Sequence, residues 1–112
     1  MPFPPLPFLT VEKMQSFIFE SARLCERMQE VIDFVEEHFE VAKDDDEKAM
    51  LFGYLLELKK CLWWTSNAQC DLGLFFFEHV GEKFMQEKIK IICDNDVKFQ
   101  KLALTIWMHF QE

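Results

Sequence analysis

The chain has little glycine and little proline for its length. Only three of its 112 residues are glycine and four are proline, and all four prolines lie within the first seven residues. A β-rich domain of this size needs many turns, and turns favour these two residue types. Their scarcity beyond Pro7 argues against an all-β domain and predicts a few long helices.

Long apolar runs are missing as well. No stretch approaches the roughly 20 consecutive apolar residues that a membrane-spanning helix needs. The first residues contain no basic segment followed by an apolar core, so we expect no signal peptide. We therefore expect an intracellular protein, cytoplasmic or nuclear, without a membrane partner.

The four cysteines form no metal-binding or redox motif. Cys25, Cys61, Cys70 and Cys93 are widely spaced, and no two of them form a Cys-x-x-Cys pair. Each lies in an apolar, periodic stretch, where a free thiol behaves as a small core side chain. We expect reduced thiols and a fold that needs neither disulfides nor metal.

Basic charge is scarce in the first half of the chain. The whole chain has a net charge of -8, and residues 1–50 carry twelve acidic and five basic side chains. A phosphate backbone is repelled by such a surface. We therefore expect no nucleic-acid partner.

The strongest pattern in the sequence is a periodic series of apolar residues near the start of the chain. Apolar residues follow alternating steps of three and four, which keeps them on one stripe of an α-helix. Ser21 occupies the one polar position in this series: Val11, Met14, Ile18, Cys25, Met28, Ile32, Val35 and Phe39. The pattern predicts a long helix that begins after an N-cap at Thr10 and ends near Val41.

Polar clusters predict where the later helices begin and end. Asp44 and Glu47 fit a capping box before a second helix. Residues 65–67, Thr-Ser-Asn, favour caps over helix interiors and predict its end. A third helix would begin there, with Cys70 and Leu74 facing inward, and Gly81 would end or kink it.

The remaining segments complete an all-α domain. Residues 82–93 fit a helix or a lone strand, and we favour the helix because a lone strand has no partner. Asp96 would cap a last helix over 96–110. We therefore predict a four- or five-helix bundle over residues 10–112, preceded by a proline-rich extended arm at 1–9. Whether the arm packs on the bundle or on a partner stays open.

No motif in the chain carries recognisable chemistry. A P-loop, Gly-x-Gly-x-x-Gly, Gly-x-Ser-x-Gly and His-Glu-x-x-His are all absent. His79 and Glu82 lie one helical turn apart and could be metal ligands or an acid–base pair, but a surface ion pair is the commoner outcome. We expect no catalytic residue, metal or cofactor. An enzyme whose site is assembled from distant residues is one alternative.

Large aromatic side chains are more numerous than a small bundle can bury. The chain has 13 Phe and three Trp, and consecutive rings point in different directions around a helix. We predict that a partner covers part of them, at these residues: Trp63, Trp64, Phe75, Phe76, Phe34 and Phe19. In the competing interpretation, the central helix is buried on nearly all sides within one monomer.

The sequence thus favours a non-catalytic protein–protein interaction module, an adaptor or complex subunit. A hetero-complex is favoured, and a homodimer would satisfy the same requirement. A further alternative is a helical domain that binds an apolar small ligand or haem, with a histidine as the ligand.

Overall fold

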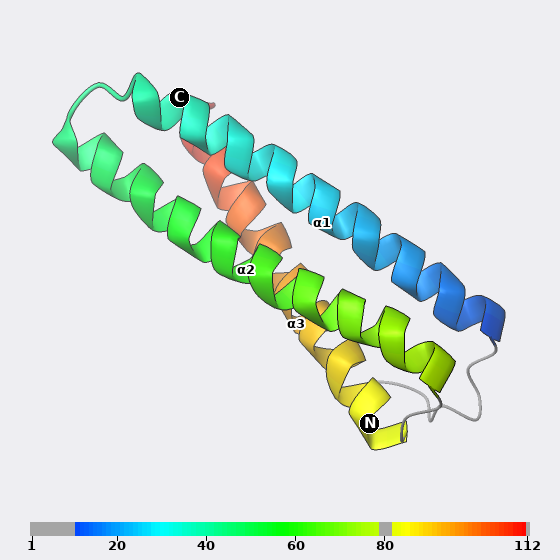
Figure 1. Cartoon of the computed structure of the whole chain (residues 1–112). Helices are drawn as coiled ribbons and strands as arrows, with labels where there is room; N and C mark the ends of the chain where they lie inside the picture. Colours follow the sequence, from blue (N-terminus) through cyan, green and yellow to red (C-terminus); the bar gives the residue numbers. More distant parts are fainter. Residues whose placement is uncertain (1–10, 79–81, 112) are drawn as a thin grey trace.

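The computed structural model describes residues 11–78 and 82–111, and almost all of them are helical. The three helices are α1 (Val11–Glu40), α2 (Asp45–Glu78) and α3 (Glu82–His109). They form an elongated up-down-up bundle in which α2 runs antiparallel to its two neighbours (Figure 1). The described residues contain no strand. The all-α prediction is therefore confirmed.

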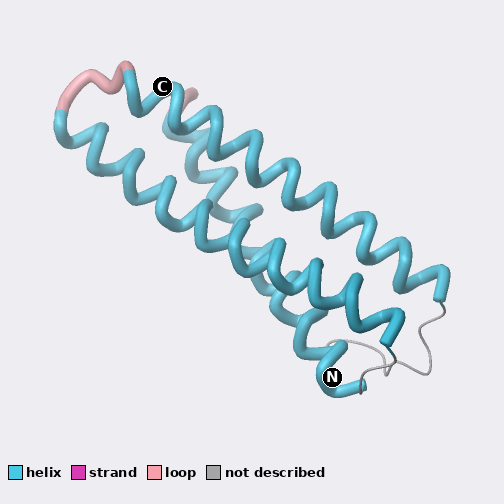
Figure 2. The backbone as a smooth tube through the Cα atoms, in the orientation of Figure 1, coloured by secondary structure: helices cyan, strands magenta, loops and turns pink. Residues whose placement is uncertain are grey.

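The second helix is the centre of the bundle. Both α1 and α3 pack along α2, whereas α1 and α3 approach each other closely at few positions. Figure 2 shows α1 and α2 joined by a short loop at one end, with α3 lying behind them. The two outer helices run in the same direction (Figure 1).

One continuous core joins the three helices. Met28, Val35, Leu51, Leu58 and Leu72 are fully buried in it. The other buried apolar side chains are Met14, Leu24, Ile32, Leu55, Cys61, Ala68, Met85, Ile89, Ile92, Phe99 and Ile106.

The predicted stripe of α1 faces this core. Met14, Met28, Ile32 and Val35 are buried along it, and so is Ser21. The Ser21 hydroxyl donates a hydrogen bond of 2.9 Å to the carbonyl of Ile18, so its burial leaves no unpaired donor. Ile18, Cys25 and Phe39 are half-buried at the edges of the stripe. The prediction omitted Leu24, which is also buried.

The predicted capping box at the start of α2 is confirmed for one of its two hydrogen bonds, the N-cap at Asp44. The Asp44 carboxylate accepts a hydrogen bond of 2.8 Å from the backbone N–H of Glu47. Asp45, Asp46 and Glu47 occupy the first turn. Their charge is favourable there because the helix dipole is positive at this end.

The prediction of four or five helices is wrong, first because α2 continues through residues 65–67. Ser66 Oγ and Asn67 Nδ2 both donate to the carbonyl of Trp63, at 3.2 and 2.7 Å. Thr65 is fully buried. The Ser66 and Asn67 side chains bond back to the preceding turn and Thr65 packs in the core, so these residues do not end the helix.

Side-chain interactions within the helix also keep α3 continuous through residues 94–96. Asn95 Nδ2 donates to the carbonyl of Ile91 at 2.8 Å, and Lys90 pairs with Asp94 at 3.1 Å. The predicted cap at Asp96 is therefore wrong. The helix predicted over 82–93 is confirmed, and it merges with the last predicted helix into one element. The proline-rich arm at 1–9, Thr10, His79 and Gly81 lie outside the described residues.

The uninterrupted α2 also corrects a predicted face. Cys70 and Leu74 were expected to point inward, but both are exposed. Because the helix has no break, the phase set by its first half continues and brings Ala68 and Leu72 into the core instead.

We predict that Ile32→Asp lowers the free energy of unfolding by about 3 kcal/mol or more, because it places an unpaired charge in the core. Ile32 is 2% exposed. Glu36→Gln is the control: its carboxylate pairs with Lys59 across α1 and α2 at 3.7 Å, with both side chains half exposed. That change should cost less than about 0.5 kcal/mol. Urea denaturation measures both, and similar losses would mean that the face of α1 is misassigned.

A second prediction concerns Thr65, whose buried hydroxyl has no hydrogen-bond partner among the described residues. Thr65→Val replaces this hydroxyl with a methyl group of similar size. It should raise the free energy of unfolding by about 1 kcal/mol, because an unpaired buried polar group is removed. Thr105→Val is the matched control, since the Thr105 hydroxyl is exposed and donates to the carbonyl of Lys101 at 3.0 Å. Greater destabilisation by Thr65→Val than by Thr105→Val in chemical denaturation would contradict the prediction.

Candidate functional site

The outer face of α2, which points away from the core, carries a second apolar row. Phe52, Leu56, Trp63 and Leu74 are 52%, 46%, 58% and 62% exposed. At 3.6 residues per turn, these four side chains lie within about 40° of one another around the helix axis. We define the outer face of α2 by these four residues. α2 thus has two apolar faces. The described chain buries the core face and leaves the outer face exposed.

Trp63 and Trp64 form an exposed aromatic pair at this face. Their ring centroids are 4.9 Å apart with the planes at 88°, an edge-to-face arrangement. The Trp63 carbonyl already accepts two hydrogen bonds from side chains of the next turn. The pair presents a large, rigid apolar area whose ordering costs little side-chain entropy.

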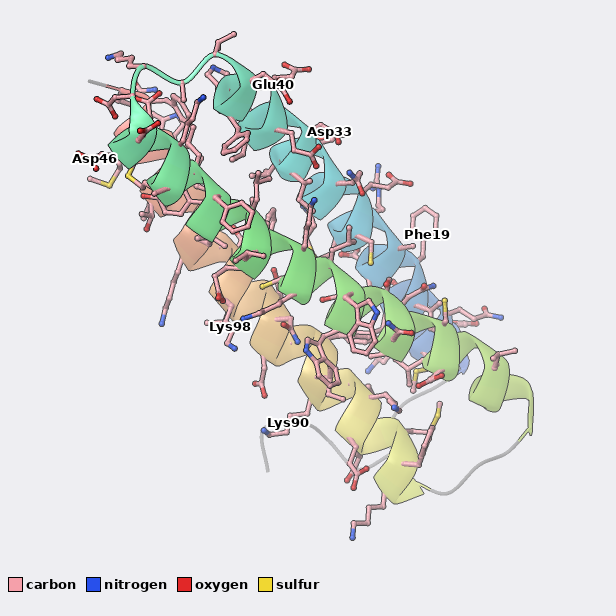
Figure 3. The ribbon with its side chains drawn as sticks, turned by 60° about the vertical axis from the view of Figure 1, so that its left-hand side comes forward. Phe19, Asp33, Glu40, Asp46, Lys90 and Lys98 are labelled. Carbon is pink, nitrogen blue, oxygen red and sulfur yellow. The ribbon has the colours of Figure 1, made fainter. Side chains whose placement is uncertain are left out.

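The other predicted partner-binding residues lie elsewhere. Phe19 is exposed on the outer side of α1 (Figure 3), with the Arg23 guanidinium 5.6 Å from its ring centroid. Phe34 lies on the side of α1 that faces α3. The side chains of Phe75 and Phe76 lie outside the described residues. Trp63 and Trp64 therefore share one surface, and Phe19 and Phe34 do not belong to it.

A groove lies between α1 and α3, toward the end of the bundle where both helices finish. It has a volume of about 880 Å³, and apolar side chains from both helices line it. The main ones are Val31 and Phe34 from α1 with Leu104, Trp107 and Phe110 from α3. We call this feature the α1/α3 groove. It exists because each outer helix packs on α2 more closely than on the other.

An aromatic cluster forms one end of the groove. The Phe34 and Phe110 rings meet edge to face with centroids 5.1 Å apart. The His38 ring lies 4.2 Å from the Phe34 ring and 4.5 Å from the Phe110 ring. His38 Nδ1 is 2.8 Å from the Phe34 carbonyl oxygen. When Nδ1 donates to that oxygen, Nε2 is the ring atom that can bind a ligand.

Sequence reasoning missed several of these residues. Phe52 lies four residues before Leu56, and Leu56 lies seven residues before Trp63. This helical spacing becomes visible once residues 45–78 are taken as one helix. Leu104 and Trp107 are 58% and 59% exposed. No sequence signal could have placed them in a groove, because the groove depends on which two helices are adjacent.

Acidic side chains gather at the same end of the bundle. Residues 28–42 contain five acidic residues and no lysine or arginine. Figure 3 shows Asp33 and Glu40 on α1 and Asp46 at the start of α2, all toward this end. The C-terminal ends of α1 and α3, the negative ends of their dipoles, lie there too. The acidic side chains therefore lie on the α1 side of the groove, whereas residues 97–111 on the α3 side carry Lys98 and Lys101 and no acidic residue.

A smaller cavity of about 350 Å³ lies between α1 and α3 along the first half of α1. Its lining is more polar and includes Glu20, Arg27, Cys93 and Asp96. Burial raises the pKa of the Cys93 thiol, and Asp96 and Asp94 shift it further upward. A nucleophilic thiol needs the opposite shift. Among the described residues, no group of three or more His, Cys, Asp and Glu side chains is placed to hold a metal.

Within the described part of the chain, no helix combines the length and apolarity needed to cross a membrane. Comparisons of the chain with protein-family models, curated proteins and solved structures gave no match. The two apolar surfaces are therefore the basis for a functional argument.

We predict that all three tryptophans of the free chain are accessible to solvent, since Trp63, Trp64 and Trp107 are 50–59% exposed. Their fluorescence should resemble that of indole in water and be quenched efficiently by acrylamide. Trp63→Phe and Trp107→Phe variants separate the signal of the outer face of α2 from that of the groove. Blue-shifted, protected emission from the dilute chain would show that one of these surfaces is already covered.

Proposed function

We propose that this chain is a non-catalytic protein–protein interaction module, an adaptor or complex subunit, that binds a protein through the outer face of α2 and Trp64. One observation carries the proposal. α2 has apolar side chains on two opposite faces, and the face bearing Phe52, Leu56, Trp63 and Leu74 is exposed. A helix on the surface of a monomer normally carries polar and charged side chains on the face that points to solvent.

The arrangement of these side chains supports an interface over chance exposure. Single exposed apolar residues are ordinary on protein surfaces, but an aligned row is not. Phe52, Leu56 and Trp63 extend over about 17 Å at 1.5 Å per residue, and Leu74 lies about 17 Å further along the same face, beyond the exposed Cys70. Tryptophan and phenylalanine are enriched at the centre of protein interfaces, where they supply much of the binding free energy.

The charge of the chain favours a different protein as the partner. Two copies would each bring a net charge of -8 to a homodimer, and like net charge opposes association. A partner with basic side chains around an apolar site meets no such penalty. We therefore propose a hetero-complex, with no nucleic acid and no membrane as partner, in the cytoplasm or nucleus.

A second candidate function is binding of an apolar small ligand or haem in the α1/α3 groove. The position of His38 supports it, because the imidazole lies among Phe34, Trp107 and Phe110 and its Nδ1 is oriented by a backbone carbonyl. Haem titration followed by absorbance tests this function. Absorbance bands of histidine-ligated haem that disappear in His38→Ala would support this function. Identical spectra from the unmodified chain and His38→Ala would contradict it.

The test of the interaction function is site-specific photo-crosslinking in cells that express the full chain. A photoreactive amino acid at position 63 should form an adduct with one polypeptide, and the same group at position 19 is the matched control. Once the partner is purified, Trp63→Ala should cost about 2 kcal/mol, or roughly 30-fold in affinity, without loss of helix content. Phe19→Ala should change the affinity less than about twofold.

Two results would contradict the interaction function. One is equal crosslinking from positions 63 and 19. The other is a monodisperse monomer in sedimentation experiments that forms no adduct from position 63.

A further inference from the structure

We propose that the α1/α3 groove binds a single basic amphipathic helix, which completes the bundle as a fourth helix. The inference concerns a different surface from the outer face of α2, and it names the chemistry of the partner. It rests on the geometry of the groove, its apolar lining and the charge around it.

The geometry is that of a bundle with one position empty. α1 and α3 run parallel and both pack on α2, but they approach each other closely at few positions, and Phe34 and His38 of α1 meet Phe110 of α3 within the groove. In a four-helix bundle the fourth helix lies in such a place and contacts both neighbours. The recognition mode is a helix in a groove, in which side chains at positions i, i+4 and i+7 act as anchors.

The groove is long enough to hold a helix that binds through anchors at positions i, i+4 and i+7. Its lining extends over residues 30–38 of α1 and 100–111 of α3, which is about 12 Å and about 16 Å at 1.5 Å per residue. An i to i+7 set of anchors spans about 10.5 Å. Val31, Phe34, Ile106 and Trp107 form the apolar lining against which such anchors would pack.

The α1 wall of the groove favours a basic occupant. Glu30 lines it directly. Asp33, Glu37 and Glu40 continue along the same half of α1, where residues 28–42 hold no lysine or arginine. A helix with lysine or arginine beside its apolar stripe gains attraction to this wall, and an acidic helix is repelled. A second copy of the chain, at -8, brings the same acids to the same wall.

The test uses the full chain and two synthetic helical peptides of equal length. Both carry leucine at the i, i+4, i+7 and i+11 positions, and the polar face is lysine in one and glutamate in the other. Fluorescence anisotropy gives the affinities, and amide chemical-shift mapping locates the bound peptide. We expect micromolar binding of the lysine peptide, at least tenfold weaker binding of the glutamate peptide, and shifts along α1 and α3.

Matched variants separate the groove from the rest of the surface. Leu104→Glu should weaken binding of the lysine peptide at least tenfold, while Phe19→Glu, which adds the same charge at another exposed apolar residue, should change it less than twofold. The Leu104 side chain is 58% exposed, so its substitution leaves the core intact, and circular dichroism verifies this. Neutralising Glu30 and Glu37 with glutamine should weaken binding and reduce its salt dependence more than neutralising Glu57 and Glu87.

Several outcomes would overturn the proposal. Equal binding of the two peptides would refute the charge argument. An unchanged affinity in Leu104→Glu, or chemical shifts confined to the outer face of α2, would refute the site. Self-association of the free chain that Leu104→Glu abolishes would show that a second copy occupies the groove. None of these outcomes bears on crosslinking from position 63, so the two proposals can fail separately.

Discussion

The buried face of α2 is the constraint on which the rest of the structure depends. Leu51, Leu58 and Leu72 are fully buried along it, and both outer helices pack against this row. Because α1 and α3 contact each other little, the position of each is set by α2. Ion pairs also connect α2 to each outer helix: Lys59 of α2 pairs with Glu36 of α1, and Asp71 of α2 pairs with Lys88 of α3. The α1/α3 groove is a direct consequence of two helices that share one support.

The parts of the fold that could be predicted from the sequence are those set by local periodicity. The 3-4 pattern gave the face of α1, and the acceptor at Asp44 gave the start of α2. The helix count could not be obtained in this way. Residues 65–67 and 94–96 have strong preferences for caps, but burial of Thr65 and hydrogen bonds from Ser66, Asn67 and Asn95 to carbonyls one turn earlier keep both helices continuous. Tertiary packing outweighs local propensity there.

The helix break wrongly expected at residues 65–67 also limited what could be predicted about the candidate site. Trp63 and Trp64 were predicted as partner-binding residues because two adjacent indoles exceed what one buried stripe can hold, an argument that needs no helix boundary, and both are exposed. Leu74 was assigned to the core because a break at residues 65–67 would have reset the helix phase. Leu104 and Trp107 belong to a groove that exists only after α1 and α3 are placed on one support. Periodicity along one helix carries no information about which helices become neighbours.

The two apolar surfaces differ in position and in electrical surroundings, and this difference bears on function. The outer face of α2 points away from α1 and α3, whereas the groove opens on the far side of the bundle between them. Both signs of charge occur along α2 beside its row, with Glu57 and Lys60 paired at 3.3 Å. On its α1 side the groove adjoins residues 28–42, which contain five acidic residues and no lysine or arginine. Under the two proposals, these surfaces on opposite sides of the bundle would bind different partners, and neither partner would block the other. Taken together, the two proposals describe a chain that would join two proteins, with the three-helix bundle as the spacer between them.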